Sequence, residues 1–141
     1  MDALNIVIAV AALALSVFTA FGFYKAGSFK AKSPRETLLA AGFGWVEKTP
    51  FGVVRLVAWL EILGALGIVL APLAAYFVPG FAWAQALGVA AAAGLALTMV
   101  GAFWVHAARG EAKYTWKMNL NLFLVATVSA VLQALVVLPL F

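Results

Sequence analysis

The chain has 141 residues, of which 67% are hydrophobic and 10% charged, with a net charge of +4. Soluble domains are about 45–50% apolar and about 25% charged, so this composition excludes a soluble globular protein and indicates one that lies in a lipid bilayer. The absence of cysteine and the single histidine exclude disulfides, thiolate metal sites and a haem with two histidine ligands, so no metal site and no catalytic set is predicted.

Four apolar stretches follow one another along the chain, each near the ~20 residues that cross a bilayer. They run over about residues 3–24, 53–77, 83–106 and 120–141. The first has no basic residue before it and is longer than the core of a signal peptide, so it is interpreted as a membrane helix. Because none of the four alternates polar and apolar residues, the sequence predicts an all-α fold, a single four-helix transmembrane bundle over residues 1–141.

The first connection, between the first two stretches, is the only long one. The sequence SPRE at residues 33–36 has the pattern of a capping box, which predicts a short helix over about 34–41. We expect this helix to lie at the membrane interface, with Leu38, Phe43 and Trp45 among its lipid contacts and Arg35 in water. Thr49 and Pro50 then resemble the cap and first residue of the second membrane helix.

The basic residues predict the orientation of the bundle. All nine lie in or beside the first and third connections: Lys25, Lys30, Lys32, Arg35, Lys48, Arg55, Arg109, Lys113 and Lys117. The positive-inside rule then places both termini outside the membrane, on the periplasmic side, and these two connections in the cytoplasm. There the charges meet anionic lipid, so a nucleic-acid partner is excluded. Arg55, Lys113 and Lys117 are interpreted as charges without a specific role.

Small and polar residues predict how the helices pack. Gly64 and Gly67 in the second stretch and Gly88 in the third favour a tight hairpin of these two helices. Gln133 and Thr98 lie deep in their stretches and are expected to form polar contacts between helices. Pro72 and Pro79 are expected to end the second helix.

Glu61 is the most informative residue of the chain. It lies roughly 8–15 Å into the second helix, where an ionised carboxylate is costly and must face the bundle. Arg55 is six residues away, which places the two side chains about 120° apart on the helix and makes Arg55 a poor partner. The sequence therefore predicts one polar pocket in the inner leaflet. Its candidate ligand-binding residues are Lys25, Glu61, His106, Asn119, Asn121, Trp59 and Trp104.

Each of these residues also has a structural interpretation. Glu61 could be a paired carboxyl that fixes helix packing, and Lys25 could anchor its helix at the interface. His106 could extend to the membrane surface. Asn119 and Asn121 could bond across helices or cap the fourth helix. The sequence leaves these alternatives open.

Several motifs together give the chain a family resemblance. They are FGFYK at residues 21–25, GFGWVE at 42–47, LEILGA at 60–65, Gly101-Ala102 followed by His106, and Asn119 or Asn121 in the fourth stretch. This pattern resembles the DoxX-like family of small four-helix membrane proteins over nearly the whole chain. The resemblance singles out Lys25, Glu61 and His106 as the polar positions of the family.

The resemblance also implies a range of functions. Members include the small subunit of thiosulfate:quinone oxidoreductase, a membrane component of a bacterial oxidative-stress complex, and assembly chaperones for acetylcholine receptors. It thus implies a bacterial inner-membrane accessory subunit of a redox complex that binds a quinone or a lipid, not an autonomous enzyme. The alternative is a membrane anchor or assembly chaperone for another membrane protein. Partners would be the bilayer, an oxidoreductase or other membrane protein, or a second copy of the chain.

Overall fold

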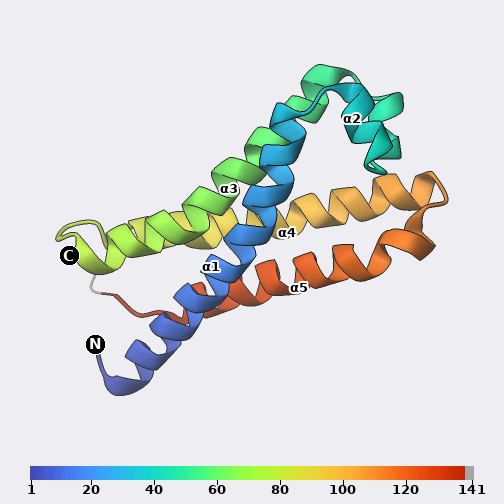
Figure 1. Ribbon diagram of the computed structural model, residues 1–141. Coiled ribbons are helices and arrows are strands. Elements are labelled where there is room, and N and C mark those ends of the chain that lie inside the picture. Colours follow the sequence, from blue (N-terminus) through green and yellow to red (C-terminus); the bar gives the residue numbers. More distant parts are fainter. Residues whose placement is uncertain (139–141) are drawn as a thin grey trace.

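The computed structural model describes residues 1–138, and every regular element in that range is a helix (Figure 1). The elements are α1 (Ala3–Lys32), α2 (Arg35–Ala40), the short 3₁₀ helix η1 (Gly44–Glu47), α3 (Phe51–Phe77), α4 (Ala84–Ala108) and α5 (Ala112–Leu135). Four of them, α1, α3, α4 and α5, are long and apolar enough to cross a membrane. The predicted all-α bundle with four membrane-spanning helices is therefore confirmed, and the short helix predicted in the first connection is present as α2.

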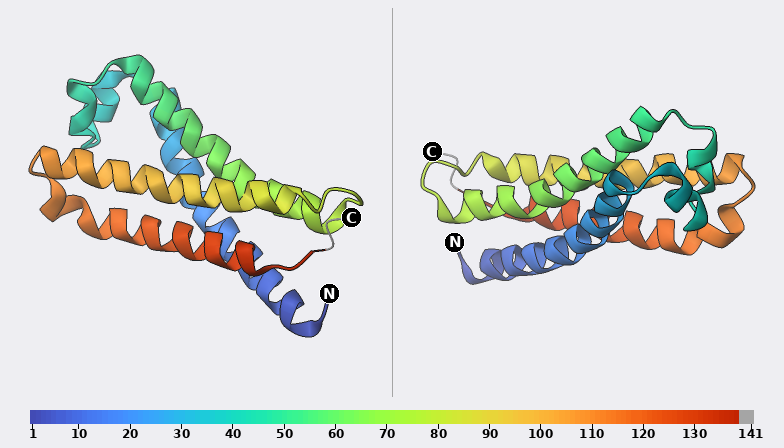
Figure 2. Two further views of the ribbon diagram at one scale, coloured as in Figure 1. Left: turned by 180° about the vertical axis from the view of Figure 1, so that it is seen from behind. Right: turned by 45° about the horizontal axis from the view of Figure 1, so that its top comes forward.

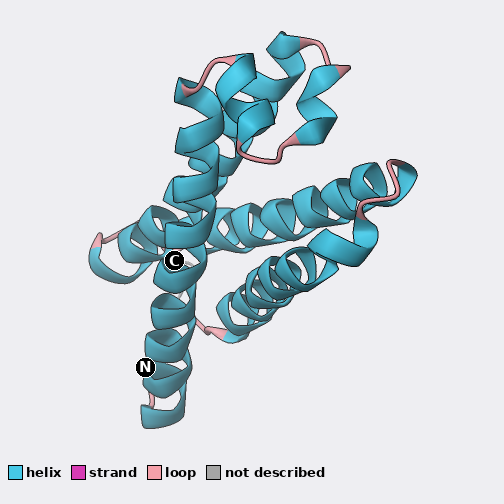
Figure 3. Ribbon diagram, turned by 45° about the vertical axis from the view of Figure 1, so that its right-hand side comes forward, coloured by secondary structure: helices cyan, strands magenta, loops and turns pink. Residues whose placement is uncertain are grey.

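The four long helices pack in the cyclic order α1, α3, α4, α5. α4 and α5 form an antiparallel hairpin, while α1 crosses α5 and runs beside α3 (Figures 1 and 2). At one end of the molecule, the C-terminal end of the described chain lies near the turn between α3 and α4, while the N-terminal end of α1 projects away from that turn (Figures 1 and 2). At the other end, α1 and α3 lean away from the α4–α5 hairpin and carry α2 and η1, which short loops join to the long helices (Figure 3).

Two helices begin or end far from the limits of their apolar stretches. α1 continues past Tyr24 to Lys32, because no helix breaker occurs before Pro34, which holds Ser33 in an extended conformation. α5 begins at Ala112 rather than near residue 120, directly after Gly110 ends α4 with a φ of 71°. Asn119 and Asn121 therefore lie inside α5 and cap nothing.

The C-terminal end of α5 is also earlier than predicted. The helix ends at Leu135, and the side chain of Asn5 in α1 bonds the extended chain after it. The Asn5 amide donates to the Val137 carbonyl at 2.7 Å, and the Val137 N–H donates to the Asn5 oxygen at 2.8 Å. The last part of the predicted fourth stretch, residues 139–141, lies outside the described residues.

Pro72 lies inside α3 and does not end it, contrary to the prediction. A proline has no N–H, so it leaves the carbonyl four residues earlier, that of Ile68, without its helical partner. The Gln133 side chain of α5 donates to this carbonyl at 2.9 Å. The Pro72 ring also packs against Gly88 of α4, where an added Cβ would lie 2.8 Å from the ring. α3 therefore runs on to Phe77 because α4 and α5 accommodate the proline.

Gln133 is the centre of a buried polar layer, as its predicted interhelical role requires. Besides Ile68, its side-chain amide donates to Ser16 of α1 at 2.7 Å, and its backbone carbonyl accepts from the Gln85 side chain of α4 at 2.7 Å. The same prediction is wrong for Thr98, whose hydroxyl donates to the Gly94 carbonyl in its own helix.

The predicted α3–α4 hairpin is confirmed, with glycines at its contacts. A Cβ on Gly64 would lie 2.6 Å from the Leu95 side chain, and one on Gly67 would lie 3.1 Å from Ala91. The central core is built around this contact and is completed by Phe23 of α1 and Ala126 of α5.

The first connection has a small core of its own. Leu38 of α2, Val46 of η1 and Val54 of α3 are fully buried against one another. The expected lipid contact is therefore wrong for Leu38, because the start of α3 covers it. Arg35 does not remain in water but donates to the carbonyls of Val46, Glu47 and Thr49.

The predicted caps of the two helices in this region are also wrong. Ser33 ends α1, and Pro34 precedes α2 without a side-chain cap, so the capping box does not form. Thr49 donates its hydroxyl to the Trp45 carbonyl instead of capping α3, which begins after Pro50.

Candidate functional site

Glu61 pairs with Lys30, a residue that the predicted pocket did not include. The Lys30 ammonium lies 2.8 Å from Oε1 and 2.7 Å from Oε2 of Glu61. Both residues are buried, with exposed fractions of 7% for Lys30 and 2% for Glu61. The extension of α1 beyond Tyr24 is what brings Lys30 beside α3. Glu61 does face the bundle as predicted, and its counter-charge comes from another helix.

Gly27 allows α1 and α3 to approach closely at this pair. A Cβ at Gly27 would lie 2.8 Å from the Ala58 carbonyl and 3.1 Å from Cβ of Glu61. Lys30 is aligned to donate to Oε1 only, so Oε2 has the charge of Lys30 beside it but no hydrogen bond from residues 1–138. The pair therefore joins two tightly packed helices.

Arg55 has a specific role, contrary to its interpretation as a lipid-facing charge. Its guanidinium donates to the carbonyls of Lys30 and Ala31, which are among the last of α1 and have no partner within the helix. The cation also lies at the negative end of the α1 dipole and stacks over the Phe51 ring, 4.5 Å from its centroid. α3 thus holds the end of α1 through both Glu61 and Arg55.

Replacing Arg55 by Met is expected to loosen the last turn of α1. The Met side chain keeps most of the apolar stem but donates no hydrogen bond to the two carbonyls. We expect a loss of ~1.5 kcal/mol in the free energy of unfolding, the usual value of a hydrogen bond to a charged group. Hydrogen exchange of the amides of residues 29–33 should accelerate. Lys48→Met, at an exposed residue of the first connection, is the control, and equal effects of the two changes would contradict the capping role.

Lys25 and Asn121 lie together, in a groove between α1 and α5. The groove has a volume of about 700 Å³, and its other walls are apolar. It is lined by Phe18, Gly22, Lys25, Ala26 and Phe29 of α1 and by Met118, Asn121, Leu122 and Val125 of α5. Both polar residues are exposed, and among residues 1–138 no carboxylate lies within ion-pairing distance of Lys25. Two of the seven predicted site residues therefore share one surface.

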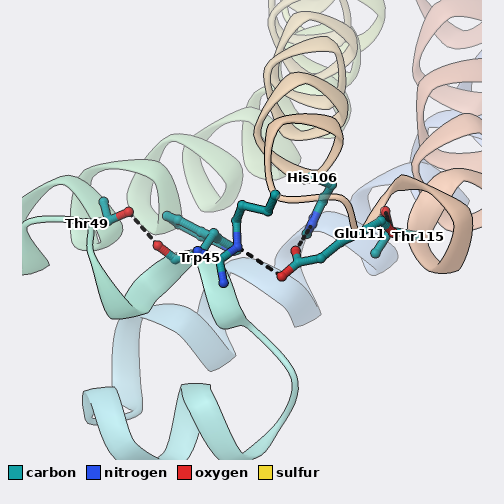
Figure 4. A network of polar contacts seen from close by, with 6 residues as sticks. Trp45, Thr49, His106, Glu111 and Thr115 are labelled. Atoms are coloured by element: carbon teal, nitrogen blue, oxygen red, sulfur yellow. Dashed lines mark hydrogen bonds and ion pairs between the residues drawn. The ribbon is translucent and has the colours of Figure 1, made fainter.

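His106 lies apart from Glu61, at the connection between α4 and α5 (Figure 4). Its Nδ1 lies 3.0 Å from Oε2 of Glu111, and Arg109 donates to Oε1 of Glu111 at 2.9 Å. An ionised carboxylate only accepts, so the Nδ1 of His106 carries the proton in this contact. η1 lies against Arg109 and Glu111, because a Cβ at Gly44 would be 2.9 Å from the Arg109 side chain and 3.0 Å from the Glu111 side chain. This cluster joins the first connection to the α4–α5 hairpin.

The contact between η1 and the α4–α5 connection is expected to weaken in acid. The hydrogen bond from His106, and after it Arg109, lowers the pKa of Glu111 below its ordinary value of 4.5. A lowered folded-state pKa means that the contact stabilises the fold above pH 4.5 and is lost as the pH falls below that value and through the lowered pKa. Fluorine NMR of a fluorotryptophan at Trp45 should show the transition. Glu111→Gln should abolish it, and an unchanged transition in that variant would contradict the assignment.

The remaining predicted site residues do not converge on Glu61 either. Asn119 is buried in α5, and its amide nitrogen has no hydrogen-bond partner among residues 1–138. Trp59 and Trp104 are exposed, at 55% and 72%, on the outer surface of α3 and α4. The single pocket expected from the sequence is therefore replaced by three separate features: the buried pair of Lys30 and Glu61, the α1–α5 groove, and the cluster of His106, Arg109 and Glu111.

Of these three features, only the groove combines open space with uncommitted polar groups. Its ammonium and amide can donate hydrogen bonds to a polar head, and its apolar walls can hold a ring or a chain. Within residues 1–138, no three His, Asp or Glu side chains are grouped so that they could hold a metal ion. The arrangement is therefore suited to binding an amphiphilic molecule.

Similarity to known proteins identifies the family of this chain. No curated protein and no solved structure matches the chain. The DoxX-like family matches it over residues 14–131, which extends from the first half of α1 to near the end of α5. The matched range contains the groove, the buried pair of Lys30 and Glu61, and the cluster at His106. The chain is therefore a multi-pass membrane protein that belongs to the DoxX-like family.

Proposed function

We propose that this protein is a membrane accessory subunit that holds an amphiphilic molecule, a quinone or a lipid, in the groove between α1 and α5. The observation that carries the proposal is the pair of exposed polar side chains, Lys25 and Asn121, in an otherwise apolar groove of about 700 Å³. Ligand pockets of this composition and of about 300–1,000 Å³ are typical of small-molecule and cofactor sites. Lys25 and Asn121 bind the head, and Phe18, Leu122 and Val125 contact the apolar part.

The setting of the groove supports an accessory role in a bacterial inner membrane. Under the positive-inside rule, the end with α2, η1 and the α4–α5 connection is cytoplasmic and both chain ends are outside. The groove then lies in the inner leaflet, where a quinone or lipid can enter it sideways from the bilayer. Such a subunit supplies the bound molecule to an oxidoreductase of a redox or oxidative-stress complex. Residues 1–141 act as one domain in this proposal.

A second candidate function is that of a membrane anchor or assembly chaperone. One feature of α4 favours it: Gly94 and Gly101 are exposed, and nothing lies within 4 Å of the position that a Cβ would take at either. Backbone that is open in this way lets another helix approach closely within a bilayer. The partner would be another membrane protein or a second copy of the chain.

A variant with a filled groove tests the binding function. Ala26 lines the groove, so Ala26→Trp should fill it, whereas Ala90→Trp adds the same ring at an exposed position of α4. The three proteins are extracted gently from their own membrane and compared by native mass spectrometry, with thermal unfolding as the check on folding. We expect a small-molecule adduct on the wild type and on Ala90→Trp that Ala26→Trp lacks. A wild type that carries only a protein partner would favour the second candidate instead.

A further inference from the structure

Lys25 is an exposed cation in the α1–α5 groove, and no residue of the range 1–138 gives it a counter-charge. It lies seven residues before Lys32, the end of α1, which corresponds to about 10 Å along the helix. Among residues 1–138, no carboxylate pairs with it and no protein group accepts a hydrogen bond from it. In an apolar groove that opens to lipid, an ammonium is unfavourable unless an anion or water compensates it.

Four other cations near the same end of the bundle have protein partners. Lys30 pairs with Glu61, Arg109 pairs with Glu111, and Arg35 and Arg55 bond backbone carbonyls. The carboxylates of Glu61 and Glu111 are therefore already bound in ion pairs with these cations. No carboxylate of residues 1–138 approaches Lys25, so an anion that compensates it would come from outside the described chain.

The groove provides the shape for such an anion together with an apolar chain. Lys25 and Asn121 lie midway along it, with Phe29 and Met118 toward one end and Phe18 and Val125 toward the other. The rim is also positive. Lys117 lies one turn before Asn121 on the same face of α5, and Lys32 lies two turns after Lys25 on α1; both are exposed.

Resting on the proposed function, we infer that the groove selects an anionic phospholipid over a neutral amphiphile. The phosphate accepts a hydrogen bond from the Lys25 ammonium and one from the Asn121 amide nitrogen, and an acyl chain lies along Phe18, Leu122 and Val125. A quinone carbonyl could accept the same hydrogen bonds but would leave the charge of Lys25 uncompensated. Charge complementarity thus separates the two classes of ligand.

The test compares lipids that differ only in head-group charge. The purified protein in a neutral detergent receives equal amounts of phosphatidylglycerol and phosphatidylcholine with identical acyl chains, and native mass spectrometry measures the fraction of each retained. The variants are Lys25→Gln, Lys25→Arg, and Lys48→Gln as the control with the same loss of charge outside the groove. A further sample contains ubiquinone, and another contains inorganic phosphate together with phosphatidylglycerol.

We expect the wild type to retain phosphatidylglycerol preferentially and Lys25→Gln to retain it about fivefold less, the value of one lysine near an anionic lipid. Lys25→Arg and Lys48→Gln should behave like the wild type, and inorganic phosphate should not displace the lipid. Equal retention of both lipids, equal losses in Lys25→Gln and Lys48→Gln, or displacement by phosphate would overturn the inference.

The proposed function and this inference can fail independently of each other. If ubiquinone or phosphatidylcholine is retained and is lost in Ala26→Trp, the groove binds an amphiphile but does not select for charge. If the wild type retains no added molecule, both the groove function and its selectivity are wrong.

Discussion

Lys30→Met and Glu61→Leu are each expected to lower the free energy of unfolding by about 3–5 kcal/mol. Either change leaves the other member of the buried pair as an uncompensated charge between α1 and α3, which is the usual cost of breaking a buried ion pair from one side. Gly27 lets the two helices pack closely beside this pair, so the remaining charge is left in a buried position. The double variant removes both charges and replaces them with apolar side chains of similar size. It should therefore be much closer to wild type than either single variant.

Reversible unfolding by a denaturing detergent in mixed micelles measures this cycle. The control is Lys48→Met, which removes an exposed lysine and should change the free energy of unfolding little. Additive effects of the two single changes would mean that Lys30 and Glu61 do not interact in the folded protein, and the assignment of the pair would be wrong.

Gln133→Leu is the second change with a large expected effect, because it should lower the free energy of unfolding by ~2 kcal/mol. It leaves the Ile68 carbonyl of α3 without a donor in the interior, because Pro72 cannot supply the helical N–H. Pro72→Ala restores an N–H at the correct position in α3. In that background, Gln133→Leu should therefore cost at least about 1 kcal/mol less than in the wild type. The remaining cost comes from the lost bond to Ser16.

The same unfolding assay tests this dependence on the proline. Thr98→Val is the matched control. The Thr98 hydroxyl bonds only the Gly94 carbonyl in its own helix, so the substitution should change the free energy of unfolding little. If Gln133→Leu costs the same in the Pro72→Ala background as in the wild type, the Gln133 amide does not compensate for the proline, and the continuity of α3 needs another explanation.

The fold could be predicted from the sequence because hydropathy marks each membrane crossing. The errors arose where a helix extends beyond its apolar stretch. α1 was predicted to end near Tyr24, where the lysines begin, yet the first helix breaker in the sequence is Pro34. α5 was predicted to begin near residue 120, although nothing after Gly110 opposes a helix. Apolar content marks the hydrocarbon-facing part of a helix, whereas glycine and proline mark its ends.

The error at the end of α1 explains much of the error at the site. The apolar pattern places Lys30 in a connection, so it does not indicate Lys30 as the partner of Glu61 and predicts a pocket from residues that lie apart. A helix continued to Pro34 places Lys30 in the last turn of α1, within reach of Glu61 on α3. The crossing of α1 over α5, which forms the groove at Lys25 and Asn121, depends on packing between distant segments and has no sequence signal of its own.

Lys25 binds a ligand in the proposed function, whereas Lys30, five residues later, only holds the bundle together. The two roles are separated by comparing the molecules retained after gentle extraction by the wild type, by Lys25→Gln, and by the double variant Lys30→Met with Glu61→Leu. We expect Lys25→Gln to fold normally and retain much less of the bound amphiphile, while the double variant retains it as the wild type does. Loss of the amphiphile in the double variant with full retention in Lys25→Gln would place the binding site at Glu61 and show that the assignment to the groove is wrong.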